Sequence, residues 1–511
     1  MNIRTQLHRQ GLRAHRSVIW IAAFALLSFC LSGLLHPLMT WTGPRAATYI
    51  PPQSNFSPAE LNSVPRILKE NQIEAAHLIK LVPSAQGNLL QVTTSTMQPR
   101  RYFSLSNYQE LPLQDEQQAR WLASYYSGRS TNEIVNVSLQ TEFDDAYPWV
   151  NRLLPVYRVQ FLDSTTDTTN GDGNGTLTLY LYTELNALAG MTNIWRTSLQ
   201  RAFAWLHTWS WLDNINAVRV IFMLSLLASL GIMTLAGMTL LVAARKRKIQ
   251  STVRRWHRRT GGLVSLLLLA FISSGSWHLI QYADAADKQA LQTVPAFSLS
   301  TLINPSEEED EWIDKSKQDN AGGPTLPNAN SISLILGPEK KLYYRLGLPQ
   351  EKRSPSSAKT HDHHIAGIST ERPAIYIDAI THEKAPLTDE ILVTYLANAN
   401  HSSARQAAPI HTQKLDSFGN GYDFRNKRLP VWRLDYASGE SIFMDPVTGM
   451  RVETIQQSAR AESWVFSNLH KWNGLTPISG RGIRDLLMVL CITLIVGLML
   501  GGIWLRLTAK S

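Results

Sequence analysis

Six histidines at matching positions in the two halves of the chain are the residues best placed to bind a cofactor. His15 and His36 are 21 residues apart, and the same spacing separates His257 from His278. A helix rises about 1.5 Å and turns about 100° per residue, so 21 residues span about 31 Å and end near the starting face. Each pair is therefore predicted to lie along one side of a helix, with one imidazole near each end. The other two histidines of this set are His207 and His470.

The segments around these histidines are repeated, which indicates an internal tandem duplication. His15-Arg16 precedes the first apolar run of the chain, and His257-Arg258 precedes the third. Leu-His-x-Trp occurs at 206–209 and again at 469–472. One arginine follows each copy at the start of the next apolar run, and these are Arg219 and Arg484.

Two further motifs repeat outside the apolar runs. Pro-Leu-x-Asp-Glu stands at 112–116 and 386–390. Leu-Pro-Val, followed by an aromatic residue and arginine, stands at 154–158 and 429–433. Each half is therefore predicted to consist of a helix, an outer domain and a second helix.

Four apolar runs are long enough to cross a bilayer, which takes about 20 apolar residues. The first is too long for a signal peptide and has no small-x-small cleavage motif, so it is interpreted as a retained helix. The four runs are Val18–Trp41, Val220–Ala244, Gly261–Ile280 and Leu486–Leu505.

Basic residues set the predicted orientation, because short cytoplasmic segments of membrane proteins are rich in lysine and arginine. Residues 1–16 contain four basic residues, 245–259 contain eight, and the end of the chain has Arg506 and Lys510. Without these fourteen, 35 basic residues face 40 acidic ones, so the net charge of +9 indicates topology and not a nucleic-acid partner. Both termini are predicted to be cytoplasmic in a bacterial inner membrane, with two large periplasmic segments.

Composition excludes several classes of protein. Hydrophobic residues make up 44% of the chain and charged residues 17%, below the roughly 25% of a soluble domain. The two cysteines, Cys30 and Cys491, both lie in apolar runs, which excludes a disulfide framework, a zinc ribbon and an iron–sulfur cluster. The sequence contains no Walker loop, Rossmann fingerprint, HExxH motif or nucleophile elbow, so ATPase and hydrolase functions lack residues to support them.

The predicted fold is a membrane α-helical protein with four transmembrane helices and two periplasmic α+β domains. Its predicted segments are a cytoplasmic N-terminus (1–16), transmembrane helix 1 (17–42), a first periplasmic domain (43–205), an interface segment with transmembrane helix 2 (206–244), a basic cytoplasmic loop (245–259), transmembrane helix 3 (260–281), a second periplasmic domain (282–468), an interface segment with transmembrane helix 4 (469–505) and a cytoplasmic tail (506–511).

Local signals predict elements within the periplasmic domains. Ser57-Pro58-Ala59-Glu60 is a capping box with proline at the first helical position, and the helix is expected to stop or kink at Pro65. Alternating patterns and turn residues predict strands. These are Leu89–Thr94, Tyr102–Leu105, and two hairpins made of Ser333–Leu336 with Leu342–Leu346 and of Trp432–Tyr436 with Ser441–Met444.

Haem is the cofactor that the six histidines fit best. Haem iron can be held by two neutral imidazoles, which here would come from facing helices. Gly33 and Gly275 each stand three residues before a histidine and would allow a flat macrocycle to approach. Arg219 and Arg484 could pair with the haem propionates.

The same residues have simpler interpretations. Histidine is common at the ends of membrane helices, and repeat copies inherit the residues of their ancestor. Glycine also serves helix packing, and Arg219 and Arg484 could be interface anchors. Ionisable residues within membrane spans are nevertheless functional candidates by default.

His361-Asp362-His363-His364 is a second local cluster of histidines. His361 and His363 would share one face of a strand and could form a weak surface metal site. The flanking sequence SPSSAKT is typical of a flexible loop, in which the histidines would have no ligand role.

At these residues the sequence resembles the PepSY-associated transmembrane protein family. The matching segments are the His-Arg pairs before the first and third spans, Leu-Pro-Val-Trp-Arg with Met-Asp-Pro-x-Thr-Gly in 429–449, and Leu-His-Lys-Trp before the fourth span. The resemblance covers nearly the whole chain. It is looser in the first half, where Thr208 stands in place of the lysine of the last motif.

The resemblance implies an inner-membrane protein with periplasmic PepSY domains. Some members of the family are linked to iron uptake, including a ferric-siderophore reductase that carries haem b between its helices. Carried over to this chain, His15 and His257 would be ligands or relays near the cytoplasmic face. The ligands near the periplasmic face would be His36, His207, His278 and His470.

Two functions are consistent with these patterns. The first is electron transfer through haem, from a quinol or another inner-membrane donor, to a ferric siderophore or other iron chelate in the periplasm. Reduction would release iron, because chelators that hold ferric iron hold ferrous iron less well. The alternative is a PepSY-domain protein without redox activity that binds or regulates a peptide, a protease or a transporter, or that supports an import system structurally. Histidines paired across helices would favour the first function.

Overall fold

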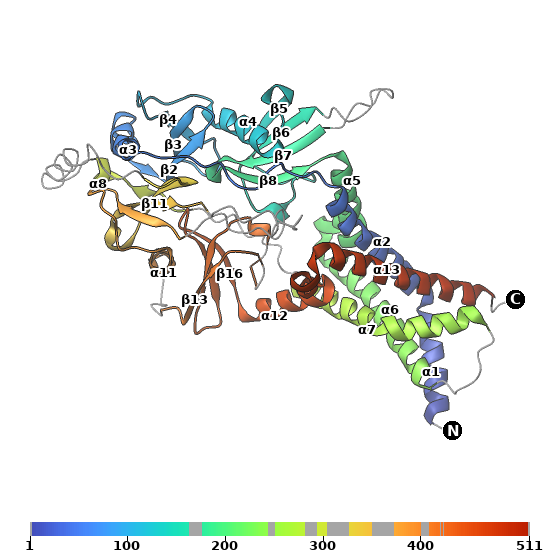
Figure 1. Cartoon of the computed structure of the whole chain (residues 1–511). Coiled ribbons are helices and arrows are strands. Elements are labelled where there is room, and N and C mark those ends of the chain that lie inside the picture. Colours follow the sequence, from blue (N-terminus) through green and yellow to red (C-terminus); the bar gives the residue numbers. More distant parts are fainter. Residues whose placement is uncertain are drawn as a thin grey trace. The chain divides into compact units, whose positions relative to one another are not determined.

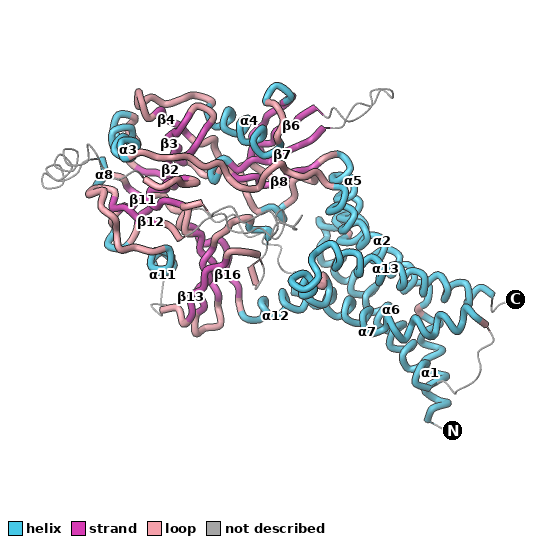
Figure 2. Tube along the Cα trace, viewed as in Figure 1, coloured by secondary structure: helices cyan, strands magenta, loops and turns pink. Residues whose placement is uncertain are grey.

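The computed structural model of the chain divides into two compact units (Figure 1). The helical unit comprises Met1–Gly43, Trp195–Lys288 and Ser458–Ser511, and the sheet unit comprises Pro44–Ile194 and Gln289–Gln457. Helices make up the first unit and strands dominate the second (Figure 2). The structure describes residues 3–162, 176–243, 251–281, 294–303, 326–349, 373–399, 408–418, 421–422 and 424–508.

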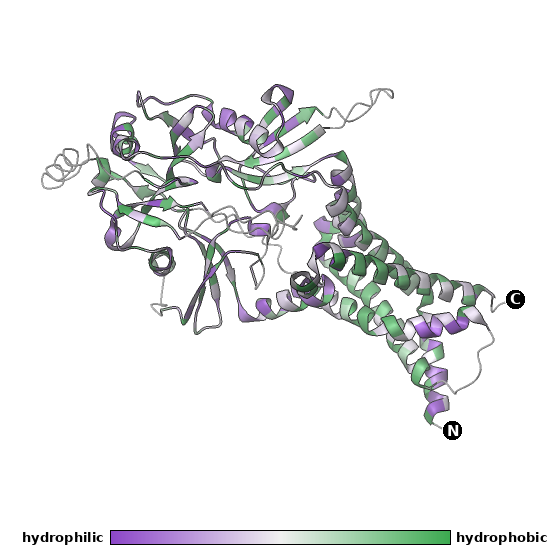
Figure 3. Ribbon diagram, in the orientation of Figure 1, coloured by the Kyte–Doolittle hydropathy of each residue, from purple (hydrophilic) through white to green (hydrophobic). Residues whose placement is uncertain are grey.

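Four long helices of the helical unit are apolar enough to cross a membrane, as predicted. Their apolar residues are concentrated along the helices, and the polar residues lie mainly on the short helix before the first span and at the start of the third (Figure 3). Together with the separate β-sheets, these helices fit a membrane protein that carries soluble domains. They are α2 (Ile19–Thr42), α6 (Asn216–Ala243), α7 (Thr252–Gln281) and α13 (Thr476–Thr508).

The first span does not continue the helix that carries His15. A short helix, α1 (Ile3–Ser17), ends where Val18 leaves helical geometry with ψ near 0°, and α2 starts afterwards. Helix α1 packs closely on α6, where a Cβ added to Gly11 would come within 2.7 Å of Thr239. The prediction that His15 and His36 lie on one continuous helix is therefore wrong, because that argument requires an unbroken helix. Helix α7 is unbroken, so the predicted rise of about 31 Å does apply between its two histidines.

Two connections in the helical unit have the same order of elements. The first runs from α5 (Ile194–Phe203) through a π-helix, η4 (Ala204–Thr208), and a 3₁₀-helix, η5 (Ser210–Ile215), into α6. The second runs from α12 (Gln457–Val465) through a π-helix, η9 (Phe466–His470), and a 3₁₀-helix, η10 (Asn473–Leu475), into α13. Trp209 and Trp472 stand at the two π-to-3₁₀ junctions with φ of 56° and 54°.

One six-stranded sheet contains strands from both halves of the chain. Its order is β12-β11-β10-β2-β3-β4, and β2 pairs antiparallel with β10 so that Leu81 lies opposite Ile332. The chain halves that were predicted as separate periplasmic domains thus share one sheet. Nearly all residues of β2 and β10 are buried, and their pairing leaves neither backbone as an open edge. The strands are β2 (Leu78–Ser84), β3 (Gly87–Thr93), β4 (Arg101–Ser104), β10 (Ser331–Leu336), β11 (Leu342–Gly347) and β12 (Ile375–Asp378).

Each half adds a four-stranded antiparallel meander to the sheet unit. Helix α4 (Gln114–Ser127) packs on the first meander, and α11 (Asp389–Ala399) packs on the second. This arrangement agrees with the predicted α+β regions, and both predicted hairpins are confirmed. The meanders are β5 (Ile134–Gln140), β6 (Val156–Leu162), β7 (Thr176–Tyr182) and β8 (Ala187–Thr192), and β13 (His411–Leu415), β14 (Val431–Asp435), β15 (Ser441–Asp445) and β16 (Met450–Ile455).

Helix α3 (Pro58–Glu70) confirms the predicted capping box, and of the stop or kink expected at Pro65 the structure contradicts the stop. The Ser57 hydroxyl accepts from the Glu60 N–H, and the Glu60 carboxylate accepts from the Ser57 N–H. Pro65 has no N–H to donate to the Leu61 carbonyl one turn earlier. The hydroxyl of Tyr344 donates to that carbonyl instead, at 3.4 Å, and the helix continues to Glu70.

The repeated Pro-Leu-x-Asp-Glu motif places one buried aspartate in the first turn of α4 and one in that of α11. Asp115 accepts from the Tyr102 hydroxyl at 3.0 Å and from the Arg100 N–H at 2.9 Å. Asp389 accepts from the Tyr376 hydroxyl at 2.6 Å and from the Arg345 guanidinium at 2.8 and 3.1 Å. Each aspartate therefore fixes its helix to a strand of the shared sheet.

Replacing Asp389 with alanine should destabilise the sheet unit by about 3–5 kcal/mol, because it removes the carboxylate that faces the buried guanidinium of Arg345. Thermal unfolding of the detergent-purified chain, followed by tryptophan fluorescence, would measure the loss. Glu390→Ala changes the next, exposed residue of the same helix turn and should have little effect. Equal unfolding midpoints for the two variants would contradict this account.

Acid should weaken the same contact. Burial alone would raise the pKa of Asp389, but Arg345, helped by the Tyr376 hydroxyl, holds it below its ordinary value of 3.8. A carboxyl whose pKa is lower in the folded state contributes its full stability above the unfolded pKa and loses it as the pH falls through the folded pKa. The thermal unfolding temperature of the native chain should therefore fall as the pH is lowered below about 4. Asp389→Asn should show less of this drop between pH 5 and pH 3, and an identical pH profile would contradict the assignment.

Candidate functional site

Six aromatic rings form a continuous row in the helical unit, which we term the ring array. At its centre the rings of His207 and His470 lie 6.4 Å apart, centre to centre, with their planes at 71°. These two histidines come from the equivalent π-helices η4 and η9. In order, the ring array consists of His36, Phe203, His207, His470, Phe466 and His278.

A phenylalanine one turn before each central histidine extends the ring array outward. Phe203 stacks on His207 at 4.7 Å, and Phe466 stacks on His470 at the same distance. On its other side Phe203 makes an edge contact with His36 of α2, at 6.2 Å. The array thus links α2 to both π-helices through ring-to-ring contacts.

Two serines hold the central imidazoles in equivalent ways. The hydroxyl of Ser32 on α2 lies 2.9 Å from Nδ1 of His207, and the hydroxyl of Ser274 on α7 lies 3.3 Å from Nδ1 of His470. Each hydroxyl donates its proton to a carbonyl one turn earlier in its own helix, that of Ser28 or Ala270. The serine oxygens are therefore free only to accept, so both histidines carry their proton on Nδ1.

This tautomer leaves the lone pair on Nε2 of both central histidines. Neither Nε2 has a hydrogen-bond partner among the described residues. Metal–imidazole bonds of about 2 Å on opposite sides of one iron would put the two ring centres roughly 6 Å apart. The observed distance between the two ring centres is 6.4 Å, with the ring planes at 71°. In addition, a Cβ added to Gly275 would come within 3.4 Å of the His470 ring, so this glycine leaves room beside the imidazole.

The two ends of the ring array have different surroundings. The His36 ring has no hydrogen bond to the described residues, and the positive charges of Lys471, Arg481 and Arg484 act on it. His278 instead forms a hydrogen bond through Nδ1 with the carboxylate of Glu462, at 2.7 Å.

Glu462 is 1% exposed, and the His278 ring stacks on Phe466 with centres 3.7 Å apart and planes at 9°. The buried carboxylate lies on α12, about one turn before the π-helix that carries His470. The structure therefore places His36, His207, His278 and His470 in one row of rings, with a carboxylate at one end.

His15 and His257 form a separate pair. Nδ1 of His257 lies 3.0 Å from the Leu498 carbonyl, and the ring fills the space beside Gly502 of α13. A Cβ added to Gly237 of α6 would come within 3.8 Å of the His15 ring. Burial, and after it the proximity of His257 and of Arg16, lowers the pKa of His15. His257 lies near the start of α7, and His278 lies near its other end.

The two predicted arginines bind the connections that carry the central histidines. Arg219 donates to Asp213 at 2.5 Å and to Asn216 at 2.7 Å. Arg484 donates to Asp485 at 2.9 Å and to Asn473 at 2.6 Å. Both guanidinium groups thus fix a 3₁₀-helix to the start of a membrane helix, which positions the preceding π-helix.

The predicted metal candidates His361 and His363 lie outside the described residues. Within the described residues no group of three or more histidine, cysteine, aspartate or glutamate side chains could hold a metal ion. A haem held by two imidazoles needs no such group.

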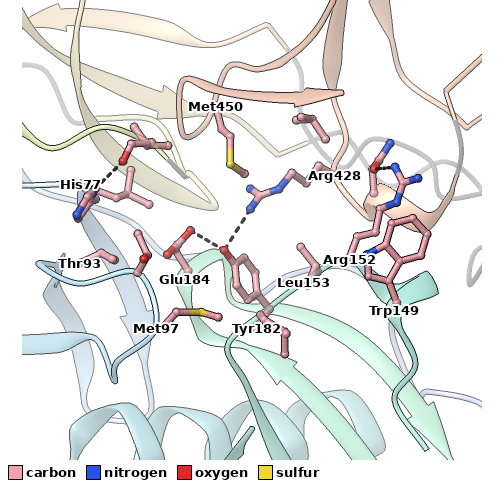
Figure 4. Close-up of a pocket in the computed structure, with 16 residues that line it drawn as sticks. His77, Thr93, Met97, Trp149, Arg152, Leu153, Tyr182, Glu184, Arg428 and Met450 are labelled. Atoms are coloured by element: carbon pink, nitrogen blue, oxygen red, sulfur yellow. Dashed lines mark hydrogen bonds between the residues drawn. The ribbon is translucent and has the colours of Figure 1, made fainter. Parts of the chain in front are cut away.

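The sheet unit contains a cavity of about 320 Å³ between segments of both chain halves (Figure 4). This volume is at the lower end of the range for small-molecule sites. The residues labelled in the close-up are polar, aromatic or thioether groups with one aliphatic side chain. They are His77, Thr93, Met97, Trp149, Arg152, Leu153, Tyr182, Glu184, Arg428 and Met450.

A chain of hydrogen bonds crosses the floor of this cavity. Arg428 donates to Asp445 at 2.8 Å and to the Tyr182 hydroxyl at 3.1 Å, and that hydroxyl donates to Glu184 at 2.6 Å. Burial alone would raise the pKa of Glu184, but Arg100 and Arg428 hold it below its usual range. The carboxylate therefore remains charged at neutral pH.

A second guanidinium lines the same cavity. Arg152 donates to Asn426 at 2.6 Å and to Glu453 at 3.1 Å, and its guanidinium carbon lies 4.8 Å above the centre of the Trp149 ring. Both guanidinium groups of the cavity are therefore already paired with carboxylates.

Several residues of the ring array, and the serines and the glutamate that bind its histidines, were not singled out from the sequence. Ser32-Gly33-x-x-His36 repeats as Ser274-Gly275-x-x-His278, and phenylalanine stands four residues before both His207 and His470. These repeats were a usable signal for the serines and the phenylalanines. Glu462 gave no such signal, because the equivalent position of the first half, eight residues before His207, is Leu199.

Comparison with models of known protein families gives no match for this chain, and comparison with curated proteins gives no match either.

Proposed function

We propose that this chain is a haem-binding electron-transfer protein of the bacterial inner membrane that reduces a ferric chelate, such as a ferric siderophore, on the periplasmic side. The observation that supports this most strongly is the central histidine pair. The ring centres of His207 and His470 lie 6.4 Å apart, and Nδ1 of each ring is bound to a serine hydroxyl, so Nε2 is the nitrogen left for a ligand. The proposal includes a tandem duplication of a PepSY-associated transmembrane unit, because the helix, π-helix and 3₁₀-helix order occurs twice.

The donor set fits haem b better than a free metal ion. Haem needs two axial ligands, and neutral imidazole is the common one. His207 and His470 would hold the iron in the centre of the array, with His36 and His278 as further ligands if a second haem is bound. A haem held by two imidazoles cycles between ferric and ferrous iron and so carries one electron at a time.

The proposed orientation puts the basic residues of 1–16 and 245–259 in the cytoplasm. His15 and His257 would then serve as ligands or relays on the side where a quinol or another inner-membrane donor delivers electrons. The sheet unit would lie in the periplasm, and its cavity would bind the chelate. Each ferric ion takes up one electron and leaves as ferrous iron, which the chelator holds less well.

Haem content should depend on the central histidines. The detergent-purified chain from haem-replete cells should show split α and β bands when reduced with dithionite, as six-coordinate haem b does. His207→Ala and His470→Ala should each lose most of the bound haem, because each removes one axial ligand. A pyridine haemochrome assay gives the haem-to-protein ratio.

His411→Ala is the matched control, because His411 is exposed on β13 of the sheet unit. It should keep the native haem content. A native chain that folds but contains no haem, or central-histidine variants with full haem content, would disprove the proposed function. In the first case a search for bound peptides or protein partners of the sheet unit would follow.

Filling the cavity should slow reduction of a small ferric chelate. Met97 lines the cavity but is 43% exposed, so it tolerates substitution. The dithionite-reduced chain, freed of excess reductant, should be reoxidised by ferric citrate at least about tenfold more slowly in Met97→Trp, at chelate concentrations below saturation. Stopped-flow absorbance of the haem α band measures this rate.

Met97→Leu keeps the side-chain volume and is the control that should reoxidise at the native rate. A ferrous-specific bipyridyl chelator in the same mixture should trap one ferrous ion per haem reoxidised. Equal rates for the two variants would place chelate reduction outside this cavity.

A further inference from the structure

The ring array is chemically unequal at its two ends, and the difference lies in one buried carboxylate. Glu462 is 1% exposed, and its one hydrogen-bond partner among the described residues is Nδ1 of His278, at 2.7 Å. At the other end no carboxylate contacts His36, within the part of the chain that the structure describes. The position equivalent to Glu462 in the first half is Leu199, which cannot accept a hydrogen bond.

A buried carboxylate is costly unless a positive charge compensates it. The described residues give Glu462 no lysine or arginine partner. A metal cation bound to the other nitrogen of the same imidazole supplies that charge. Carboxylate–histidine–metal arrangements of this kind fix the orientation of the ring and make the imidazole a stronger donor.

We infer that Glu462 is a positioning residue that accepts the Nδ1 proton of His278, directs its Nε2 to haem iron and stabilises the ferric form there. This inference rests on the proposed function, since it requires a haem ligated by His278. Its consequence is a gradient along the ring array. Electrons are held less tightly at the His278 end than at the His36 end, where no carboxylate of the described residues contacts the imidazole.

The stacking of His278 supports a role in positioning. The ring lies flat against Phe466, with centres 3.7 Å apart and planes at 9°, so rotation about its side-chain bonds would break that contact. The hydrogen bond to Glu462 then determines which ring nitrogen of His278 faces α12. His207 and His470 are fixed by neutral serine hydroxyls, which donate no comparable negative charge to the ligand.

Potentiometric titration of the purified, haem-loaded chain, followed by the α band, tests this inference. Glu462→Gln keeps the shape and removes the charge, and Glu462→Leu introduces the residue of the first half. Loss of a supporting carboxylate changes metal affinity by roughly 10- to 100-fold, and a tenfold change in the ferric-to-ferrous affinity ratio equals about 59 mV for one electron. One midpoint potential should therefore rise by about 60–120 mV in Glu462→Leu and by less in Glu462→Gln.

Electron paramagnetic resonance of the ferric protein gives a second readout, because a weaker imidazole donor changes the low-spin g values. Ser463→Ala, the neighbouring residue on α12, is the control and should leave both readouts unchanged. Unchanged potentials and g values in Glu462 variants that retain their haem would overturn the inference and leave the proposed function intact. Loss of haem from both variants without recovery in Glu462→Asp would also overturn it, whereas a native chain without haem would disprove the proposed function itself.

Discussion

The N–H groups of the two central imidazoles, His207 and His470, are bound by serine hydroxyls of the neighbouring helices, and these contacts organise the helical unit. Ser32 and Ser274 provide these hydroxyls from α2 and α7, while their own protons satisfy carbonyls of the same helices. The two bonds hold η4 and η9 against the membrane helices. The π-helical turns carry the two histidines. The positions of the two rings therefore depend both on this helix geometry and on the serine hydrogen bonds.

The sheet unit follows a different constraint, which is the need to pair every buried strand. Strand β2 has neighbours on both sides only because β10 arrives from the other half of the chain. Buried aspartates at equivalent places, Asp115 and Asp389, then attach one helix of each half to this sheet. Contacts such as that of Arg152 with Glu453 add charged links between the halves around the cavity.

Much of this architecture is readable from local sequence, and the rest depends on contacts that local sequence does not encode. Hydropathy alone predicts four spans, and turn residues such as Gly337-Pro338 predict the hairpins. Pro65 misleads because the compensating hydroxyl, that of Tyr344, is 279 residues away. The pairing of Leu81 with Ile332 has the same cause, since nothing near either residue specifies the other. The repeated segments predict the histidines of the candidate site. Glu462 has no counterpart in the first half, so the repeats could not predict it.

The strand pairing across the two halves has a consequence for how the protein is made. During synthesis β2 is complete about 250 residues before β10, with two membrane helices to be inserted between them. Throughout that interval the sheet formed by β2, β3 and β4 has an unpaired, apolar edge at β2. Such an edge is prone to pair with other chains. The first half of the sheet unit is therefore complete only after the second half has been synthesised. A chain truncated after α6 would be left with that edge permanently exposed.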